Sequence, residues 1–205
     1  MTRAHPALTL LALTVLALAS PPLGARDWRA DPERSTLEFT GSAQGEAFTG
    51  RFARFQPRIR FDPDRLDQAR FDVEIDLASA DTGNSERDQT LKGGDFFAIG
   101  RHPSARYLAE RFRALPDGRY AADGQLTLRG LTRPVTLNFQ WQPGPGGDGT
   151  TLVLEGEAVL TGDTALDRMQ FDLGTGDWAD PDTLAHTVRV ETRLVLIAEP
   201  TPSEP

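Results

Sequence analysis

The chain has 205 residues, of which 39% are apolar, so it is long enough to bury the core of one sizeable β domain or of two small ones. Its formal net charge of −8 argues against nucleic acid as the main partner. The absence of Cys excludes disulfides, thiolate catalysis, Cys-ligated zinc, iron–sulfur clusters, thioether-linked haem and a lipid-anchored bacterial lipoprotein. The 19 Gly and 15 Pro favour short strands and many turns over long helices.

Residues 1–25 differ in composition from the rest of the chain. A basic start at Arg3 leads into an apolar run from Leu8 to Ala19, which Pro21 and Pro22 interrupt before a stretch of small residues. This pattern predicts a secretory signal peptide, with an uncleaved membrane anchor as the alternative. Because exported chains without Cys suit a bacterial periplasm, we expect a periplasmic protein. No internal boundary is visible, so residues 26–198 are predicted to form one domain.

Alternating apolar and polar residues dominate this domain and are typical of strands with one buried face. They predict strands, in chain order, at residues 36–40, 70–77, 107–115, 120–129, 134–141, 152–160 and 187–197. Residues 48–61 are also strand-like, but the register of their phenylalanines is unclear.

Two segments carry helical signals between these strands. Asn84 or Ser85 can cap a helix within residues 84–98, and Gly93-Gly94 can stop it. A second short helix is predicted at residues 63–68. The Pro-rich residues 199–205 are predicted to be disordered.

Turn signals separate the strands at short intervals. They lie at Pro116-Asp117-Gly118, at residues 129–134 and in the Gly-rich loop 142–149. About eight antiparallel strands can form either a sandwich or a closed barrel. Their Phe-rich inward face can be a solid core or a cavity, and the pattern alone favours a solid core.

Two segments carry a recognisable signature. Residues 75–91 (IDLASADTGNSERDQTL) are followed by Asp95-Phe96-Phe97 and His102-Pro103, and residues 124–137 read GQLTLRGLTRPVTL. Together they resemble the YceI-like family of secreted, lipocalin-like proteins that bind polyisoprenoids and related lipids. The resemblance extends over residues 28–198.

The resemblance implies an all-β fold, an extended eight-stranded antiparallel lipocalin-like barrel with one or two short covering helices. It also implies an isoprenoid or other amphiphilic lipid as the ligand and no cofactor, and it is compatible with a homodimer. On this basis the residues expected to line an apolar pocket are Phe39, Phe71, Val73, Ile75, Phe96, Phe97, Leu126, Leu128, Leu137, Phe139 and Trp178.

A third segment resembles the branch of this family that is associated with membrane b561-type cytochromes. It comprises Leu166-Asp167-Arg168 and residues 174–180, although Asp172 follows Phe171 where that branch commonly has Gly. This likeness implies an alternative role, an accessory redox partner that presents a quinone to such a cytochrome. Trp178 could then stack on a quinone ring, or it could pack on the barrel end.

The densest polar cluster comprises Asp81, Asn84, Arg87 and Asp88. Arg87 could donate to a ligand head group. Alternatively, the cluster could form a capped helix with a local Arg–carboxylate pair that holds the helix on the barrel. Phe96-Phe97 could plug the barrel or line its mouth.

Signals for catalysis and for metal binding are sparse. His102 and His186 have no partner at ligand spacing, and we expect surface or capping roles for them. Asp163, Asp167, Asp177, Asp180 and Asp182 are predicted to lie in loops, without the spacing of an EF-hand. No nucleophile elbow, P-loop or dinucleotide fingerprint is present in the sequence, so we expect a binding protein. A lipid-modifying enzyme that uses one of the two histidines is the remaining alternative.

Overall fold

The computed structural model describes residues 25–144, 146–147, 152–154 and 156–200. The expected signal peptide up to residue 24, residues 145 and 148–149 of the predicted loop, and residues 201–205 therefore lie outside the described residues. The strands are β1 (Arg26–Ala30), β2 (Thr36–Ala43), β3 (Glu46–Phe52), β4 (Phe55–Phe61), β5 (Arg70–Asp76), β6 (Ala80–Asp81), β7 (Ser104–Ala114), β8 (Tyr120–Leu128), β9 (Leu131–Pro143), β10 (Gly146–Gly147), β11 (Leu152–Val153), β12 (Glu157–Asp167) and β13 (Thr187–Ala198).

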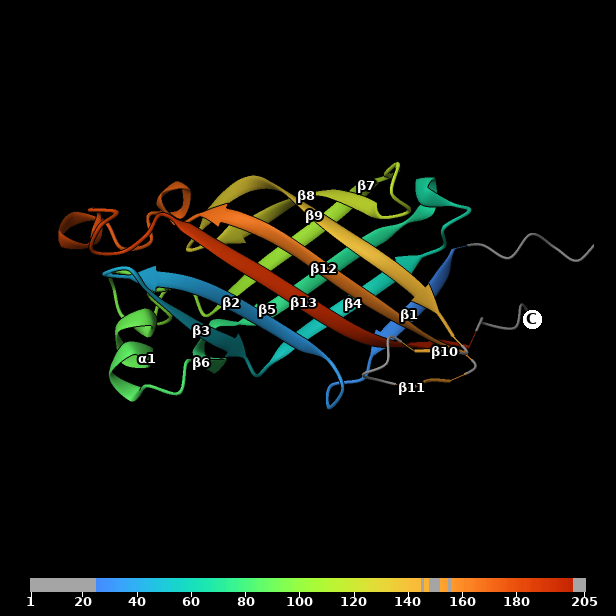
Figure 1. Cartoon of the computed structure of the whole chain (residues 1–205), viewed down its shortest axis with the longest axis horizontal. Helices are drawn as coiled ribbons and strands as arrows, with labels where there is room; N and C mark the ends of the chain where they lie inside the picture. The colour runs from blue at the N-terminus through green and yellow to red at the C-terminus, as the bar shows by residue number, and fades with distance from the viewer. Residues whose placement is uncertain (1–24, 145, 148–151, 155, 201–205) are drawn as a thin grey trace, which may run out of the picture.

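The strands close into a barrel (Figure 1). Neighbours pair in the order β1-β4-β5-β7-β8-β9-β12-β13, and β13 pairs back to β1. The pairings of β2 with β13, β2 with β3, and β3 with β6 extend the same wall, so β1 and β2, β3 and β4, and β5 and β6 act as three broken strands. Every pairing is antiparallel. The barrel of eight strands that the sequence predicted is confirmed, and the sandwich alternative is wrong.

The side-chain period of two decides which residues face the barrel interior. On β5, Phe71 is buried while its neighbours Arg70 and Asp72 are less so. On β7, Ala105 and Tyr107 are buried and alternate with exposed Arg106. The exposed positions carry cross-strand ion pairs, such as Arg106 with Asp72 at 2.7 Å. The alternation seen in the sequence is therefore the alternation of inner and outer barrel faces.

The only α-helix among the described residues is α1 (Ser85–Lys92). Asn84 caps it, because its side-chain oxygen accepts a hydrogen bond from the Arg87 amide at 3.0 Å. The helix ends at Lys92 with Gly93 as its C-cap, so the predicted stop at Gly93-Gly94 within residues 84–98 is confirmed. Four short 3₁₀ turns complete the helical content, namely η1 (Leu66–Gln68), η2 (Leu77–Ser79), η3 (Arg168–Phe171) and η4 (Gly176–Trp178). None of the helices in the described part of the chain is long and apolar enough to cross a membrane.

Three strand predictions need correction. Residues 48–61 form two strands rather than one, since the chain bends at residues 53–54. The predicted strand 152–160 is interrupted at Gly156, whose φ of +80° suits glycine. β12 then continues to Asp167, so Asp163 and Asp167 lie on a strand and not in loops. The short strand β1 was missed.

The two ends of the barrel are built differently. Figure 1 shows α1 and the segment that follows β12 at one end, and β1 with the C-terminal end of β13 toward the other. The second end is filled by aromatic rings, among which Phe61 contacts Phe139 and Tyr120 at centroid distances of 5.2 Å each. Phe71 and Phe112 pack at 4.8 Å in the same cluster. We call this set the aromatic plug; it comprises Trp28, Phe61, Phe71, Phe112, Tyr120, Phe139 and Trp141.

Candidate functional site

The barrel encloses an elongated cavity of about 690 Å³. Its walls come from the inner faces of the long strands, and α1 with the segment after β12 borders its mouth. Ten of the eleven residues predicted from the sequence line this cavity, and they are Phe39, Phe71, Val73, Ile75, Phe96, Phe97, Leu126, Leu128, Leu137 and Trp178. The preference for a solid core that the alternation alone gave is therefore wrong for this half of the barrel.

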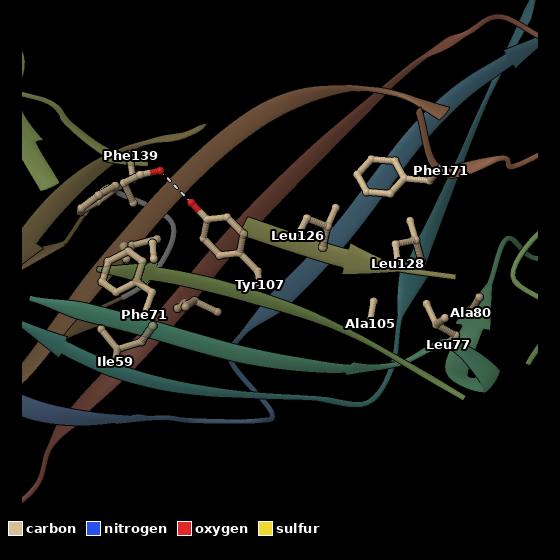
Figure 2. Packing of buried hydrophobic residues seen from close by; sticks show 14 of the residues in the cluster. Ile59, Phe71, Leu77, Ala80, Ala105, Tyr107, Leu126, Leu128, Phe139 and Phe171 are labelled. Atoms are coloured by element: carbon tan, nitrogen blue, oxygen red, sulfur yellow. Dashed lines mark hydrogen bonds between the residues drawn. The ribbon is translucent and has the colours of Figure 1, made fainter. Parts of the chain in front are cut away.

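Phe139 is the predicted lining residue that the structure places elsewhere. Only 1% of its surface is exposed, and it does not border the cavity. Its ring stacks on Tyr120 at 5.5 Å and contacts Phe71 at 5.2 Å within the aromatic plug. Figure 2 shows Phe139, Phe71 and Ile59 on one side of Tyr107, and Leu128 and Phe171 on the other. Phe139 therefore closes the cavity from behind.

Sequence reasoning missed four phenylalanines of the cavity wall, of which one is Phe171 on η3. Phe48, Phe52 and Phe55 all line it, and they come from the segment whose register was unclear. Phe52 contacts Phe39 at 5.2 Å and Phe97 at 6.0 Å. The bend between β3 and β4 hid them, because it breaks the period of two on which the prediction relied. The inward residues Leu166, Val188 and Val190 of β12 and β13 were also missed.

Tyr107 is the one tyrosine that lines the cavity, and its hydroxyl is not free to bind a ligand. That hydroxyl donates to the carbonyl oxygen of Ala122 at 2.7 Å and lies 3.3 Å from that of Val135 (Figure 2). Burial raises the pKa of Tyr107 well above its ordinary value, so the phenol stays neutral at physiological pH. The surrounding wall is aliphatic and aromatic, which suits an apolar ligand and gives a charged one no partner.

The DTGN motif builds the corner that leads into α1. Asp88 accepts hydrogen bonds from the Thr82 amide at 2.9 Å and from the Thr82 hydroxyl at 2.7 Å. Asp81 accepts from the Gly83 amide at 3.0 Å and pairs with Arg51 at 3.3 Å. These bonds hold the helix on the barrel, as the structural interpretation of the cluster predicted.

Arg87 departs from that interpretation. It forms no ion pair with any carboxylate in the described part of the chain, so the predicted local Arg–carboxylate pair is wrong. Its Nε donates to the Thr82 hydroxyl oxygen at 3.0 Å, and its guanidinium lies 4.7 Å from the centre of the Phe48 ring. Arg87 also borders the cavity, which places a cation at the mouth.

Arg168 is a buried cation that sequence reasoning named only as part of the b561-like segment, without a role for its side chain. Its guanidinium donates to five backbone carbonyl oxygens, those of Leu173 (2.6 Å), Gly174 (2.6 Å), Trp178 (2.5 Å), Leu184 (2.7 Å) and Ala185 (3.0 Å). No carboxylate pairs with it among the described residues. Burial lowers the pKa of Arg168, but an arginine remains charged at physiological pH. The side chain therefore fixes residues 173–185 over the mouth.

The remaining motif residues converge on the same end. Phe96 contacts Trp178 edge-to-face at 5.6 Å, and both rings border the cavity. Gly174 makes this approach possible, since a Cβ there would lie 2.8 Å from the Phe96 ring. Arg129 donates to the carbonyl oxygens of Asp95 and Asp172 at 2.8 and 2.5 Å, which ties the β8–β9 turn to both loops. The signature segments thus assemble the mouth and hold its shape.

The described histidines and acidic residues have local structural partners. His186 Nε2 lies 2.8 Å from the Ala179 carbonyl oxygen, and the His102 ring lies beside Gly130. Across the part of the chain that the structure describes, no group of three or more His, Cys, Asp or Glu residues could hold a metal ion. Asp180 accepts from the Asp182 amide at 2.9 Å, as expected of turn chemistry.

Comparison with known proteins agrees with the architecture. The family model of the YceI-like domain matches residues 28–196. A UPF0312 protein of Vibrio parahaemolyticus is 31% identical over 177 residues, covering 82% of this chain and 91% of that protein. A UPF0312 protein of Pseudomonas paraeruginosa is 34% identical over 144 residues, covering 66% of this chain and 73% of that protein.

Solved structures share the barrel. BcnA of Burkholderia cenocepacia superposes with a TM-score of 0.73 at 24% identity, covering 81% of this chain and 98% of that one. A polyisoprenoid binding domain from Saccharophagus degradans, implicated in plant cell wall breakdown, gives a TM-score of 0.62 at 16% identity, covering 84% of this chain and 98% of that one. At these identities the likeness concerns the fold.

Proposed function

The chain belongs to the YceI-like domain family, and from this premise we propose that it is a binding protein which encloses the tail of one long-chain lipid, of the isoprenoid class, in its barrel. The observation that carries the proposal is the 690 Å³ cavity, lined by apolar side chains and closed behind by the aromatic plug. Such a cavity can take an extended apolar tail from one end only.

The energetics of burial favour such a ligand. Each C5 isoprene unit has about 100 Å² of apolar surface, so its transfer from water contributes about 2.5 kcal/mol. Three units would contribute about 7.5 kcal/mol before the costs of lost translation and tail ordering. The hydroxyl of Tyr107 already donates to the Ala122 carbonyl oxygen, so an apolar tail beside it does not cost a hydrogen bond. The similarity of the fold to that of the polyisoprenoid binding domain from Saccharophagus degradans supports the same ligand class.

We further propose that the protein works in a bacterial periplasm. Residues 1–25 carry the basic start, apolar run and small residues of a secretory signal peptide. The intact mass of the protein purified from the periplasmic fraction tests this directly. The expected mass is that of a chain beginning near residue 26. The mass of the full chain with Met1, found in the membrane fraction, would contradict export as a free protein.

A quinone is the second candidate within this class. Trp178 and Phe96 place two aromatic rings at the mouth, where a planar quinone head could stack on them. This arrangement supports the alternative role as a redox partner of a b561-type membrane cytochrome. Quinone binding that Trp178→Ala weakens, while binding of a prenyl alcohol is unchanged, would support it; equal loss for both ligands would contradict it.

Native mass spectrometry of the protein from its own periplasm, followed by solvent extraction, tests the central proposal. The expected result is one isoprenoid per chain. The matched variants are Val73→Trp, which fills the cavity, and Leu108→Trp, which places the same ring on the outer face of the adjoining strand. Val73→Trp should lose the ligand and Leu108→Trp should keep it. An empty wild-type protein that also rejects added prenyl lipids would refute the proposal.

A further inference from the structure

The charged groups that border the cavity are confined to one end. Among its described lining residues they are Glu86 and Arg87 on α1 and Arg168 on η3, while the deep wall is apolar. The aromatic plug blocks the opposite end. A lipid whose tail fills the cavity must therefore leave its head group at the mouth, between α1 and the segment that Arg168 holds.

Arg87 is held in place there without a direct ion pair among the described residues. The sheet places Phe48 opposite Gly41, and a Cβ at Gly41 would lie 2.7 Å from the Phe48 ring, so the end of the ring packs closely on the β2 backbone. That ring supports one face of the Arg87 guanidinium at 4.7 Å. Thr82 binds Nε at 3.0 Å, and the Thr82 hydroxyl is itself oriented by Asp88. The two terminal nitrogens of Arg87 have no partner recorded in the described part of the chain.

The free donors at the mouth favour a ligand group with two acceptor oxygens. Arg87 and Arg168 contribute two positive charges; Glu86 contributes one negative charge from an exposed position, and Asp88 contributes another, held near Arg87 through the Thr82 hydroxyl. Arg168 has spent its donors on carbonyl oxygens, so it acts by charge alone. Arg87 keeps a planar pair of N–H donors, the geometry that binds two oxygens of one carboxylate or phosphate. An uncharged alcohol would use only one of them.

We propose that this mouth is a subsite for an oxyanion head group, a carboxylate or a phosphate, which Arg87 binds through its terminal nitrogens. The inference rests on the proposed function, since it concerns the head of the lipid whose tail the barrel encloses. It assigns Arg87 the selection of head groups and leaves tail binding to the apolar wall. The chain's overall charge of −8 gives no such attraction, so selection depends on the terminal N–H donors of Arg87.

Matched ligands with one tail and three heads test the subsite. Delipidated protein is titrated with farnesol, farnesoic acid and farnesyl phosphate, for wild type, Arg87→Gln and the control Arg58→Gln. Arg58 is exposed on the outer face of β4, so its substitution makes the same change in net charge away from the mouth. Arg87→Lys keeps the charge but loses the planar fork, and circular dichroism confirms that each variant is folded.

Wild type and Arg58→Gln should bind at least one of the two anions about tenfold or more tightly than farnesol, because charge-assisted hydrogen bonds add to tail burial. Arg87→Gln should remove this preference and leave farnesol affinity within about twofold, and Arg87→Lys should retain part of it. The carboxylate and phosphate arms show which oxyanion the mouth accepts. Equal binding of all three heads by wild type would refute the subsite and leave lipid binding intact. Failure of every ligand to bind would refute the proposed function itself.

Discussion

Replacement of Phe139 by Ala tests the division of the barrel into a packed end and an open cavity. The ring is fully buried and contacts Phe61, Phe71, Phe112 and Tyr120 at centroid distances of 5.2, 5.2, 6.4 and 5.5 Å. Its loss removes about 100 Å² of buried apolar surface, worth about 2.5 kcal/mol, and leaves a void of about 80 Å³ that costs about 2 kcal/mol more. We expect Phe139→Ala to lower the free energy of unfolding by about 4 kcal/mol.

Phe39→Ala is the matched control, because it makes the same change in the cavity wall. Its ring contacts Phe52 at 5.2 Å and already borders the open cavity. No new enclosed void forms, so we expect a loss of only about 2.5 kcal/mol, the transfer contribution alone. Ligand binding should respond in the opposite order. Phe39→Ala removes a contact with the tail and should weaken affinity about fivefold, whereas Phe139→Ala should leave affinity within about twofold.

Urea unfolding of delipidated protein measures the two stabilities, and fluorescence titration with farnesol measures the affinities. Delipidation matters because a bound ligand would add to the apparent stability of every variant. Equal losses of stability in the two variants, or a loss below about 1 kcal/mol for Phe139→Ala, would refute the reasoning that one half of the barrel is packed and the other is open.

Three further outcomes follow from individual contacts. Gly50→Ala places a Cβ 2.3 Å from the Phe39 ring and should push that ring into the cavity. The expected result is a loss of about 1–3 kcal/mol in the free energy of unfolding by urea and weaker lipid binding, which unchanged binding would contradict. Arg168→Met leaves five carbonyl oxygens without their donor and should destabilise by about 3 kcal/mol, with faster hydrogen exchange of amides in residues 173–185; unchanged exchange there would show that other contacts hold the segment. Arg34 donates to both oxygens of Glu157 at 2.6 and 3.2 Å and holds the pKa of Glu157 below its ordinary 4.5. The difference in unfolding free energy between wild type and Glu157→Gln should therefore have its full value above pH 4.5 and shrink as the pH falls through the lowered pKa. A difference that does not depend on pH would refute the role of the charge.

The alternation of residues determined that the domain is all-β, and the family resemblance chose the barrel over the sandwich. A period of two on strands such as residues 70–77 specifies one buried and one exposed face, and the turn signals limit the strand count. The signature around Asn84 and Thr82 also predicted a capped helix held to the barrel, because capping chemistry is local in sequence. Where the strand bends, at residues 53–54, the period breaks and the register of Phe48 and Phe52 could not be read.

Whether an inward phenylalanine borders space or another ring depends on residues far away in the chain. Phe71 and Phe139 have the same local pattern, yet Phe71 reaches the cavity and Phe139 is enclosed by rings from β4, β7 and β8. Arg168 gives the same lesson for polar groups, because its partners are backbone carbonyls that no sequence pattern marks. The sequence by itself determined the elements, the faces and the family signature. Only the closed barrel determined where the cavity ends and that Arg87 lies at its mouth against Phe48, since both features depend on contacts between segments distant in the chain.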